Sequence, residues 1–393
     1  MHVIAAVDSF KGSMTSLQAG QAVKRGILAS IPDADVVIKP VADGGEGTVT
    51  SLTEGMQGEM IRLSVTGPMG DPVMAQYGIL ADHVAVLEMA QAAGLPLVPE
   101  EKKNPLLMTT YGVGEMILDA LSRGCRSFII GIGGSATNDG GTGMLSALGF
   151  RFEKEDGSCI AENAAELDQI SRIDLTMADP RLADCEFKIA CDVTNPLCGE
   201  NGASAVFAPQ KGADEIMVKR LDQGLAHYAQ KTAESLRRDE RDAPGAGAAG
   251  GLGFAFVSYL HAKLVSGVDL ILDMVLDDQE LDRADVIVTG EGCFDAQTGM
   301  GKAPYGIAKR GKEHGCLVLA LAGSVTTSEK SPYLDAVFSI QQGPVSLQEA
   351  MQTEAACKNM ELTSRQVFGL LQYMDRRKNS ENRRNRSEKN HCR

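Results

Sequence analysis

Residues 131–143 form a loop whose composition points to anion binding. They combine six glycines with Ser135, Thr137 and the Asn138–Asp139 pair, directly after an apolar run. Glycines leave the backbone N–H groups uncovered, so that these groups can approach an anion closely. The short helix expected at 144–149 adds an N-terminus, which favours negative charge. The loop therefore favours an enzyme that acts on a small molecule through phosphate chemistry.

Three further loops follow apolar runs near the chain ends, at residues 8–13, 43–48 and 290–302. The carboxyl ends of parallel strands meet at one edge of a sheet, where ligands bind. Phosphoryl transfer needs carboxylates for Mg²⁺ and cations for the phosphates. The candidate carboxylates are those of Asp8, Asp43, Glu46, Glu291 and Asp295, and the candidate cations are those of Lys11 and Lys302.

The middle of the chain adds three loops of the same character. Asp192 and Asn195 follow the apolar run 187–191, Lys211 stands on a turn before a helix, and Gly247 lies in a glycine-rich lead into another helix. A strand-end Asp or an Asp-Gly turn alone is usually a cap or a turn. Six such loops in one chain make a purely structural interpretation improbable.

Known motifs leave one competing enzyme class open. Gly301-Lys302 lacks the upstream glycine of a phosphate-binding P-loop. Gly131-x-Gly133-x-x-Ala136 follows a predicted strand, which keeps an NAD(P)-dependent dehydrogenase as an alternative. Asp139 argues against it, because a carboxylate in that loop repels a pyrophosphate. A serine hydrolase is disfavoured because the chain has no G-x-S-x-G elbow.

The element pattern predicts two α/β domains, one inserted in the other. Strands expected near both chain ends alternate with helices, which is typical of a parallel sheet covered on both faces. Gly-Pro, Asp-Pro and Leu-Pro breaks in 64–100 indicate short strands that are partly antiparallel. We expect an α/β domain from residues 1–63 and 284–375, with a mixed α/β domain inserted at 64–283. The strands of the first domain are expected at 3–7, 36–38, 286–288, 317–321 and 336–340, and its helices at 15–30, 303–314 and 347–374.

Composition and charge exclude other partner classes. The 393 residues have 44% hydrophobic content and a net charge of −14, with no apolar run of the length, about 18 residues, that spans a membrane. Residues 376–393 hold eight Lys or Arg against two Glu, which predicts a basic, disordered tail on an acidic body. An acidic body argues against nucleic acid. The nine cysteines include no C-x-x-C pair, which favours reduced thiols in the cytoplasm over zinc.

The loops resemble those of the type 1 glycerate kinases over about residues 1–375. The resemblance implies ATP-dependent phosphorylation of D-glycerate with Mg²⁺, and a flavodoxin-like domain interrupted by a second α/β domain. The partners implied are D-glycerate and ATP, and a homo-oligomer is left open. The resemblance is carried by Asp8-Ser-Phe-Lys-Gly, Val41-Ala-Asp-Gly-Gly-Glu-Gly-Thr, the 131–141 string, Cys191-Asp-Val-Thr-Asn-Pro-Leu, Pro209-Gln-Lys-Gly-Ala, Pro244-Gly-Ala-Gly-Ala-Ala-Gly-Gly and Thr289-Gly-Glu-Gly.

Roles for the candidate residues follow from this hypothesis. Asp192 or Asp295 is expected to accept the proton of the acceptor hydroxyl, and Asp43 or Glu291 to hold Mg²⁺. Lys11, Lys211 and Lys302 are expected to neutralise phosphates or the glycerate carboxylate. The other residues expected to bind substrate or ATP are Asp8, Ser9, Glu46, Ser135, Thr137, Asn138, Asp139, Asn195 and Gly247.

One position departs from the family pattern. The pattern has Gly-Glu-Gly-Arg where this chain has Gly290-Glu-Gly-Cys293. A thiol cannot replace the two parallel hydrogen bonds that a guanidinium gives to a carboxylate or phosphate. A catalytically weakened homologue that only binds small molecules is therefore a further alternative, and the sequence leaves the choice between the 2- and 3-hydroxyl open.

Overall fold

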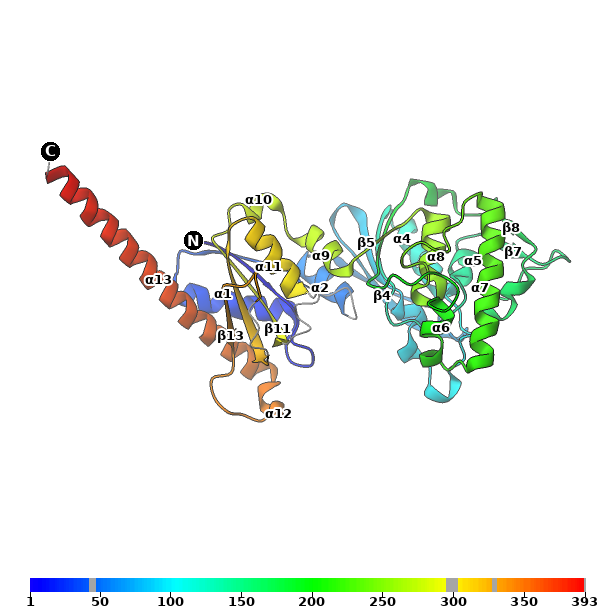
Figure 1. Cartoon of the computed structure of the whole chain (residues 1–393), viewed down its shortest axis with the longest axis horizontal. Coiled ribbons are helices and arrows are strands. Elements are labelled where there is room, and N and C mark those ends of the chain that lie inside the picture. The colour runs from blue at the N-terminus through cyan, green and yellow to red at the C-terminus, as the bar shows by residue number, and fades with distance from the viewer. Residues whose placement is uncertain (42–46, 295–302, 327–330, 392–393) are drawn as a thin grey trace. The chain divides into compact units, whose positions relative to one another are not determined.

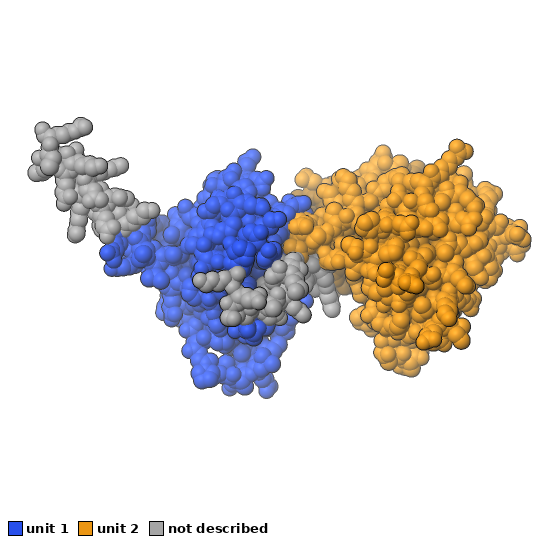
Figure 2. Space-filling view, in the orientation of Figure 1, with its two compact units in different colours: residues 1–43, 271–393 blue, residues 44–270 orange. Residues whose placement is uncertain are grey.

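The computed structural model describes residues 1–41, 47–294, 303–326 and 331–391, with the side chains of the last helix as far as Arg377. The chain divides into two compact units, shown in Figure 2: unit 1 is Met1–Asp43 with Ile271–Arg393, and unit 2 is Gly44–Leu270. The sequence had placed these boundaries at 63/64 and 283/284. The first boundary lies earlier because β3 (Glu59–Thr66) pairs along its whole length with β4 (Pro72–Ile79) of unit 2.

Unit 1 is built on a five-stranded parallel sheet in the order β13-β12-β11-β1-β2. In the unit's own chain order this is 2-1-3-4-5, the flavodoxin-like arrangement, and it confirms the predicted fold class. Val7 pairs with Gly290, and Gly290 with Leu321, so that β1, β11 and β12 end at the same edge. The strands are β1 His2–Val7, β2 Asp35–Ile38, β11 Val286–Phe294, β12 Leu317–Val325 and β13 Ala336–Ser339.

Helices cover both faces of this sheet (Figure 1). Helices α1 (Ser16–Ser30) and α13 (Thr353–His391) lie side by side on one face, where they share a core cluster with Val3 and Val7. Helix α11 (Ala303–Glu313) lies on the other face, close to Ile287. Side chains of a strand alternate between its two faces, so a sheet buried on both needs apolar residues throughout.

The C-terminal segment is helical where the sequence predicted disorder. Helix α13 continues from Thr353 to His391, so the basic residues after 376 extend it. After Gly369 no Gly or Pro interrupts this stretch, and Arg, Lys, Glu and Gln are good helix formers. A short helix, α12 (Leu347–Ala350), precedes it and begins with a capping box between Ser346 and Glu349.

Unit 2 has a mixed six-stranded sheet in the order β10-β9-β6-β5-β4-β3. Strands β3, β4 and β5 are antiparallel, as the breaks in 64–100 predicted, and β5, β6, β9 and β10 are parallel. A small two-stranded antiparallel sheet joins β7 (Arg151–Glu153) to β8 (Arg172–Asp174), and such three-residue strands leave no periodic pattern in the sequence. The remaining strands are β5 Val84–Glu88, β6 Ser127–Gly131, β9 Glu186–Ala190 and β10 Lys263–Val265.

Helix α8 (Ala248–Leu260) ends where the backbone changes conformation: His261 adopts a left-handed conformation (φ 52°) and Lys263 begins β10. Among the described helices, none combines the length and apolar content that a bilayer crossing requires. The remaining helices are α2 Thr48–Gly55, α3 Ala90–Ala93, α4 Tyr111–Ser122, α5 Thr142–Ala147, α6 Ala203–Phe207, α7 Glu215–Leu236, α9 Gly267–Val275 and α10 Asp278–Leu281.

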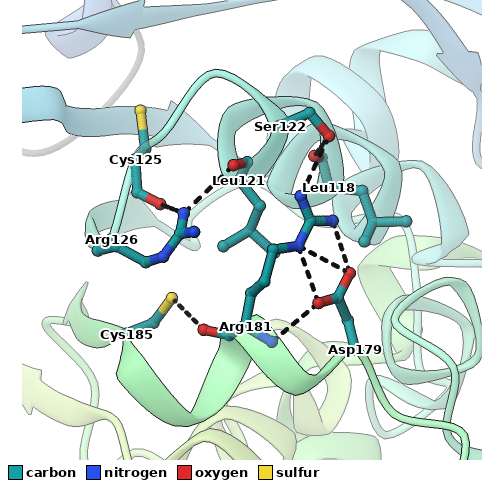
Figure 3. A network of polar contacts seen from close by, with 8 residues as sticks. All are labelled: Leu118, Leu121, Ser122, Cys125, Arg126, Asp179, Arg181 and Cys185. Atoms are coloured by element: carbon teal, nitrogen blue, oxygen red, sulfur yellow. Dashed lines mark hydrogen bonds and ion pairs between the residues drawn. The ribbon is translucent and has the colours of Figure 1, made fainter.

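A polar network fixes the amino-terminal ends of β6 and β9 (Figure 3). Arg126 donates to the carbonyl oxygens of Leu121 and Cys125, and its own carbonyl accepts the Glu186 N–H at 2.8 Å. Arg181 binds the Asp179 carboxylate through both Nε and Nη2. The loops before β6 and β9 are thereby braced at the edge opposite the polar loops that follow these strands.

Candidate active site

A pocket of about 520 Å³ opens at the carboxyl ends of β1, β11 and β12 in unit 1. This is the point between β1 and β11 where the strand order reverses, the usual ligand site of a flavodoxin-like sheet. Part of its wall is polar and part is apolar. It is lined by Asp8, Ser9, Phe10, Lys11, Ser13, Glu291, Gly292, Cys293, Gly323, Ser324, Ile340, Gln341, Leu347, Ala350, Met351 and Ala356.

Two predicted carboxylates stand on neighbouring strands of this pocket, Asp8 directly after β1 and Glu291 within β11. The Asp8 N–H donates to the Gly290 carbonyl at 2.9 Å, which continues the β1–β11 pairing and brings Asp8 next to Glu291. Both residues are less than a tenth exposed, and one Asp8 oxygen accepts the Ser9 N–H. Lys11 lies on the same loop and is exposed. The structure thus brings together four predicted residues, Asp8, Ser9, Lys11 and Glu291.

Cys293 occupies the wall of the same pocket. It lies in β11, pairs with Ser324 of β12, and is exposed. Because the residue lines the pocket, the arginine of the family pattern would extend from this position toward a bound ligand. The thiol that stands here instead is a weak hydrogen-bond donor.

A second polar cluster follows β6 in unit 2, and it surrounds a buried lysine. Lys211 is 2% exposed, and its Nζ donates to Ser135 Oγ and to the Thr137 carbonyl, both at 2.7 Å. Burial lowers the pKa of Lys211 to about 7, and the charge of Asp139 opposes that shift. The ammonium was expected to neutralise a phosphate. In the structure it holds the 131–139 loop in shape from inside.

Asp139 has a similar structural task. Its carboxylate is fully buried and accepts hydrogen bonds from the N–H and hydroxyl of Thr110 and from the N–H groups of Gly141 and Gly143. Burial raises the pKa of Asp139 above the usual value, and these hydrogen bonds oppose the rise. The carboxylate predicted to bind a ligand therefore organises the turn that leads into α5.

Two other residues of this loop retain unused hydrogen-bonding capacity. The Asn138 amide donates to Ser204 Oγ at 3.0 Å, but its Oδ1 and the Thr137 hydroxyl are buried without a hydrogen-bond partner among the described residues. Gly133 and Gly134 are exposed at the tip of the loop. The loop combines exposed glycines at its tip with buried polar atoms that have no described partner, and glycine-rich turns of this kind can bind anions through their backbone N–H groups.

Asp192 stands at the end of β9, next to the 131–143 loop in the sheet. Its side chain is exposed, and one oxygen accepts the Gly267 N–H at 3.0 Å at the start of α9. Asn195 and Gly247 instead hold their own loops together: the Gly247 N–H donates to the Asn195 carbonyl at 2.9 Å, and a Cβ on Gly247 would lie 2.2 Å from the Pro196 carbonyl oxygen. Asp192 is thus the strand-end acid of unit 2 best placed for chemistry.

The remaining candidate residues include two that the sequence did not predict and four that the structure does not describe. Within the described ranges, no group of three or more His, Cys, Asp or Glu is arranged to hold a metal ion. Sequence reasoning missed Glu88, which ends β5 and accepts the Val49 N–H at 3.0 Å, and Gln341, which follows β13. Their position at the end of an apolar run was the signal that could have found them. Four predicted residues lie outside the described residues: Asp43, Glu46, Asp295 and Lys302.

Burial of Lys211 should make the free energy of unfolding depend on pH. In the unfolded chain the Lys211 pKa returns to about 10.5, so between pH 7 and 10.5 the unfolded state binds a proton that the folded state lacks. The free energy of unfolding therefore rises with pH in this window, by about 1 kcal/mol per pH unit for this group. Lys211→Met removes that contribution, which urea unfolding of both proteins at pH 7, 8 and 9 measures. Equal pH slopes for the two proteins would contradict the burial of a titrating ammonium.

Comparisons with known proteins agree on one family. The family model of the glycerate kinase family matches residues 3–372. The chain is 46% identical to the glycerate kinase of Halalkalibacterium halodurans, over 92% of this chain and 98% of that one. It is 43% identical to the glycerate 2-kinase of Escherichia coli K12, over 94% and 98%. The crystal structure of a putative glycerate kinase 2 from Salmonella typhimurium LT2 superposes with a TM-score of 0.88 at 42% identity, over 96% of this chain and 99% of that one.

Proposed function

The chain belongs to the glycerate kinase family and is a phosphotransferase acting on an alcohol group, and we propose that it transfers the γ-phosphoryl group of ATP, with Mg²⁺, to the 2-hydroxyl of D-glycerate. The observation that carries the proposal is the unit 1 pocket, where Asp8, Lys11 and Glu291 line one cavity at the switch point of the sheet. The choice of the 2-hydroxyl is supported by the Escherichia coli relative, a glycerate 2-kinase. Because each relative named above is a glycerate kinase, the dehydrogenase alternative is set aside.

The carboxylates of the pocket suit a magnesium ion. Mg²⁺ prefers oxygen ligands and is commonly held by one or two carboxylates together with substrate phosphates. Asp8, directly after β1, and Glu291, within the neighbouring strand β11, offer such a pair, and Ser9 lines the same pocket. When bound, the ion would neutralise phosphate charge, which is its usual task in phosphoryl transfer. Asp43, expected to share this task, lies outside the described residues.

We assign the binding of glycerate and the removal of its hydroxyl proton to residues of unit 2. Gly133 and Gly134 would offer backbone N–H groups to the glycerate carboxylate, with Thr137 and Asn138 completing the polar loop. Asp192, exposed at the next strand end, would accept the hydroxyl proton as phosphoryl transfer proceeds. Lys211 acts through the loop that it shapes, and is a positioning residue.

The cysteines support a reducing compartment, and we place the enzyme in the cytoplasm. The eight described cysteines are all free thiols. Disulfides are the rule in oxidising compartments and rare in the cytosol. We propose no nucleic-acid or membrane partner, because a protein with a net charge of −14 is repelled by their negative charge.

Phosphorus NMR of the reaction mixture tests the proposed product. Purified protein is incubated with MgATP and D-glycerate, and the phosphate ester signal is recorded without proton decoupling. A phosphate on the 2-hydroxyl has one neighbouring proton and gives a doublet, whereas a phosphate on the 3-hydroxyl has two and gives a triplet. A doublet supports the proposal, a triplet overturns the 2-hydroxyl, and inorganic phosphate alone overturns transfer to glycerate.

Restoring the family arginine should raise activity. Cys293→Arg places a guanidinium on the pocket wall, where it can add charge-assisted hydrogen bonds to phosphate. We expect kcat/KM for ATP to rise about tenfold, with Cys293→Ser as the control that removes the thiol without adding charge. Equal activity of the arginine and serine variants would show that this wall does not contact the transferred charge.

A further inference from the structure

We propose that the unit 1 pocket binds the adenosine part of ATP, and that Gln341 recognises the adenine base. The inference rests on the proposed use of ATP and extends it, because it assigns one of the two substrates to one cavity and names the residue that selects the base.

The pocket has two chemically different walls. The first is formed by the loop after β1 and the end of β11, and it carries the charged groups of Asp8, Lys11 and Glu291. The second is formed by the segment after β13 and is almost entirely apolar, with Ile340, Leu347, Ala350, Met351 and Ala356. A nucleotide has the same division between an aromatic base and its ribose and phosphates. Glycerate, which carries a carboxylate and two hydroxyls on three carbons, has no apolar part to match the second wall.

The size of the cavity agrees with this assignment. Pockets that enclose drug-sized ligands have volumes of about 300–1,000 Å³, and a nucleoside of about 19 non-hydrogen atoms is of that class, whereas glycerate has about seven. The cavity of about 520 Å³ lies within this range. Glycerate alone would leave most of it, including the apolar wall, in contact with water.

The apolar wall is partly uncovered at the mouth. Leu347 is 76% exposed and Met351 38% exposed, although both line the pocket. The Met351 methyl group lies over Gly12, where a Cβ would be 3.0 Å from it, so this side chain reaches the loop after β1. A flat base inserted here would cover both side chains, and the polarisable thioether of methionine packs well on aromatic rings.

Gln341 is the polar group within the apolar wall. Its backbone N–H donates to Ser339 Oγ at 3.1 Å, but its side-chain Oε1 is buried and has no hydrogen-bond partner among the described residues. The neighbouring Gln342, by contrast, donates to the Ile340 carbonyl and to Thr363 Oγ1. A buried amide oxygen without a partner is unfavourable, and a ligand that donates to it restores the lost hydrogen bond.

Adenine offers the complement of a glutamine amide. Its exocyclic amino group donates to the amide oxygen, while the adjacent ring nitrogen accepts from the amide NH₂. Guanine presents two acceptors on the corresponding edge and cannot satisfy the amide oxygen there. The Ser13 hydroxyl, also buried without a described partner, lies on the same pocket and would suit a ribose hydroxyl. Gln341 is therefore expected to select ATP over GTP.

Nucleotide binding to variants tests the assignment of Gln341. We would measure ADP, GDP and adenosine affinity by calorimetry for the wild type, Gln341→Leu and Gln341→Glu. Loss of the amide should weaken ADP binding about 10- to 100-fold and narrow the preference for ADP over GDP. Gln352→Leu is the matched control, since Gln352 is exposed and does not line the pocket. Equal ADP affinity of the wild type and both Gln341 variants would overturn the assignment.

Thiol labelling of the wild type tests the pocket independently of any variant. Cys293 is exposed on the pocket wall, and Cys159 is exposed in unit 2. ADP should slow alkylation of Cys293 several-fold and leave Cys159 unchanged, as followed by peptide mass spectrometry. If ATP-dependent phosphorylation of glycerate proceeds but ADP leaves Cys293 unprotected, the pocket assignment is overturned and the proposed function stands. If ADP protects Cys293 but no phosphoryl transfer occurs, the pocket assignment stands and the proposed function fails.

Discussion

Asp192→Asn should lower kcat for glycerate phosphorylation by about 10²–10⁴-fold, the contribution of a positioned general base. The variant isolates the chemistry, because an asparagine oxygen can still accept the Gly267 N–H that Asp192 accepts at 3.0 Å. We therefore expect the urea unfolding midpoint to stay close to that of the wild type. The measurement is kcat under saturating ATP and D-glycerate.

Two comparisons separate this role from a structural one. Asp222 also accepts one backbone N–H, from Gly199 at 2.9 Å, so Asp222→Asn is a matched control that should keep full activity. Asp192→Ala removes both the carboxylate and the bond to Gly267, and should lose stability as well as activity. Near-normal turnover by Asp192→Asn would remove Asp192 from the mechanism and leave Asp295 as the predicted base.

Lys11→Met should lower kcat/KM for ATP by about 10²–10³-fold. A cation aimed at the charge that develops on a transferring phosphoryl group contributes on this scale. Lys11 is exposed on the pocket loop, so its ammonium can meet a phosphate without first leaving a buried environment. The measurement is initial-rate kinetics with ATP varied at saturating D-glycerate, and Lys11→Arg should recover part of the loss because it keeps the charge.

Lys358→Met is the matched control for this loss. Lys358 is exposed in the same unit but does not line the pocket. It should leave the ATP parameters unchanged. If Lys11→Met and Lys358→Met behave alike, the cation of the donor site must be sought elsewhere, with Lys302 as the remaining candidate from the sequence.

The strands and the parallel sheet of unit 1 could be predicted, because its buried strands are short apolar runs separated by helical periodicity. The strand order could not be read from periodicity and came from the family resemblance. The compact units divide at 43/44, earlier than the expected limit at 63/64, because β3 pairs with β4, a pairing that no local pattern encodes. The end of α8 at Leu260 could not be predicted either, because it depends on the left-handed conformation of His261, which only the structure shows.

The candidate site, like the fold, could be predicted only in part. Strand-end acids such as Asp8 and Glu291 were predictable, because the residues after parallel strands share one edge of the sheet. The tasks of Lys211 and Asp139 were not, since they depend on hydrogen bonds to Ser135 and Thr110, which are 76 and 29 residues away in the chain. Residue type suggested two ligand-binding charges, which stays a prediction, and the long-range contacts add that both side chains hold the loop together from inside.

The most direct test of the account is ADP release from MgATP by the wild-type protein, measured with and without D-glycerate in a coupled assay. The account predicts release that depends on D-glycerate and saturates with it, with little release in its absence. No release under either condition, or release that is the same with and without D-glycerate, would contradict a glycerate kinase. Release restored only by Cys293→Arg would instead identify a member of the family disabled at one residue of the pocket wall.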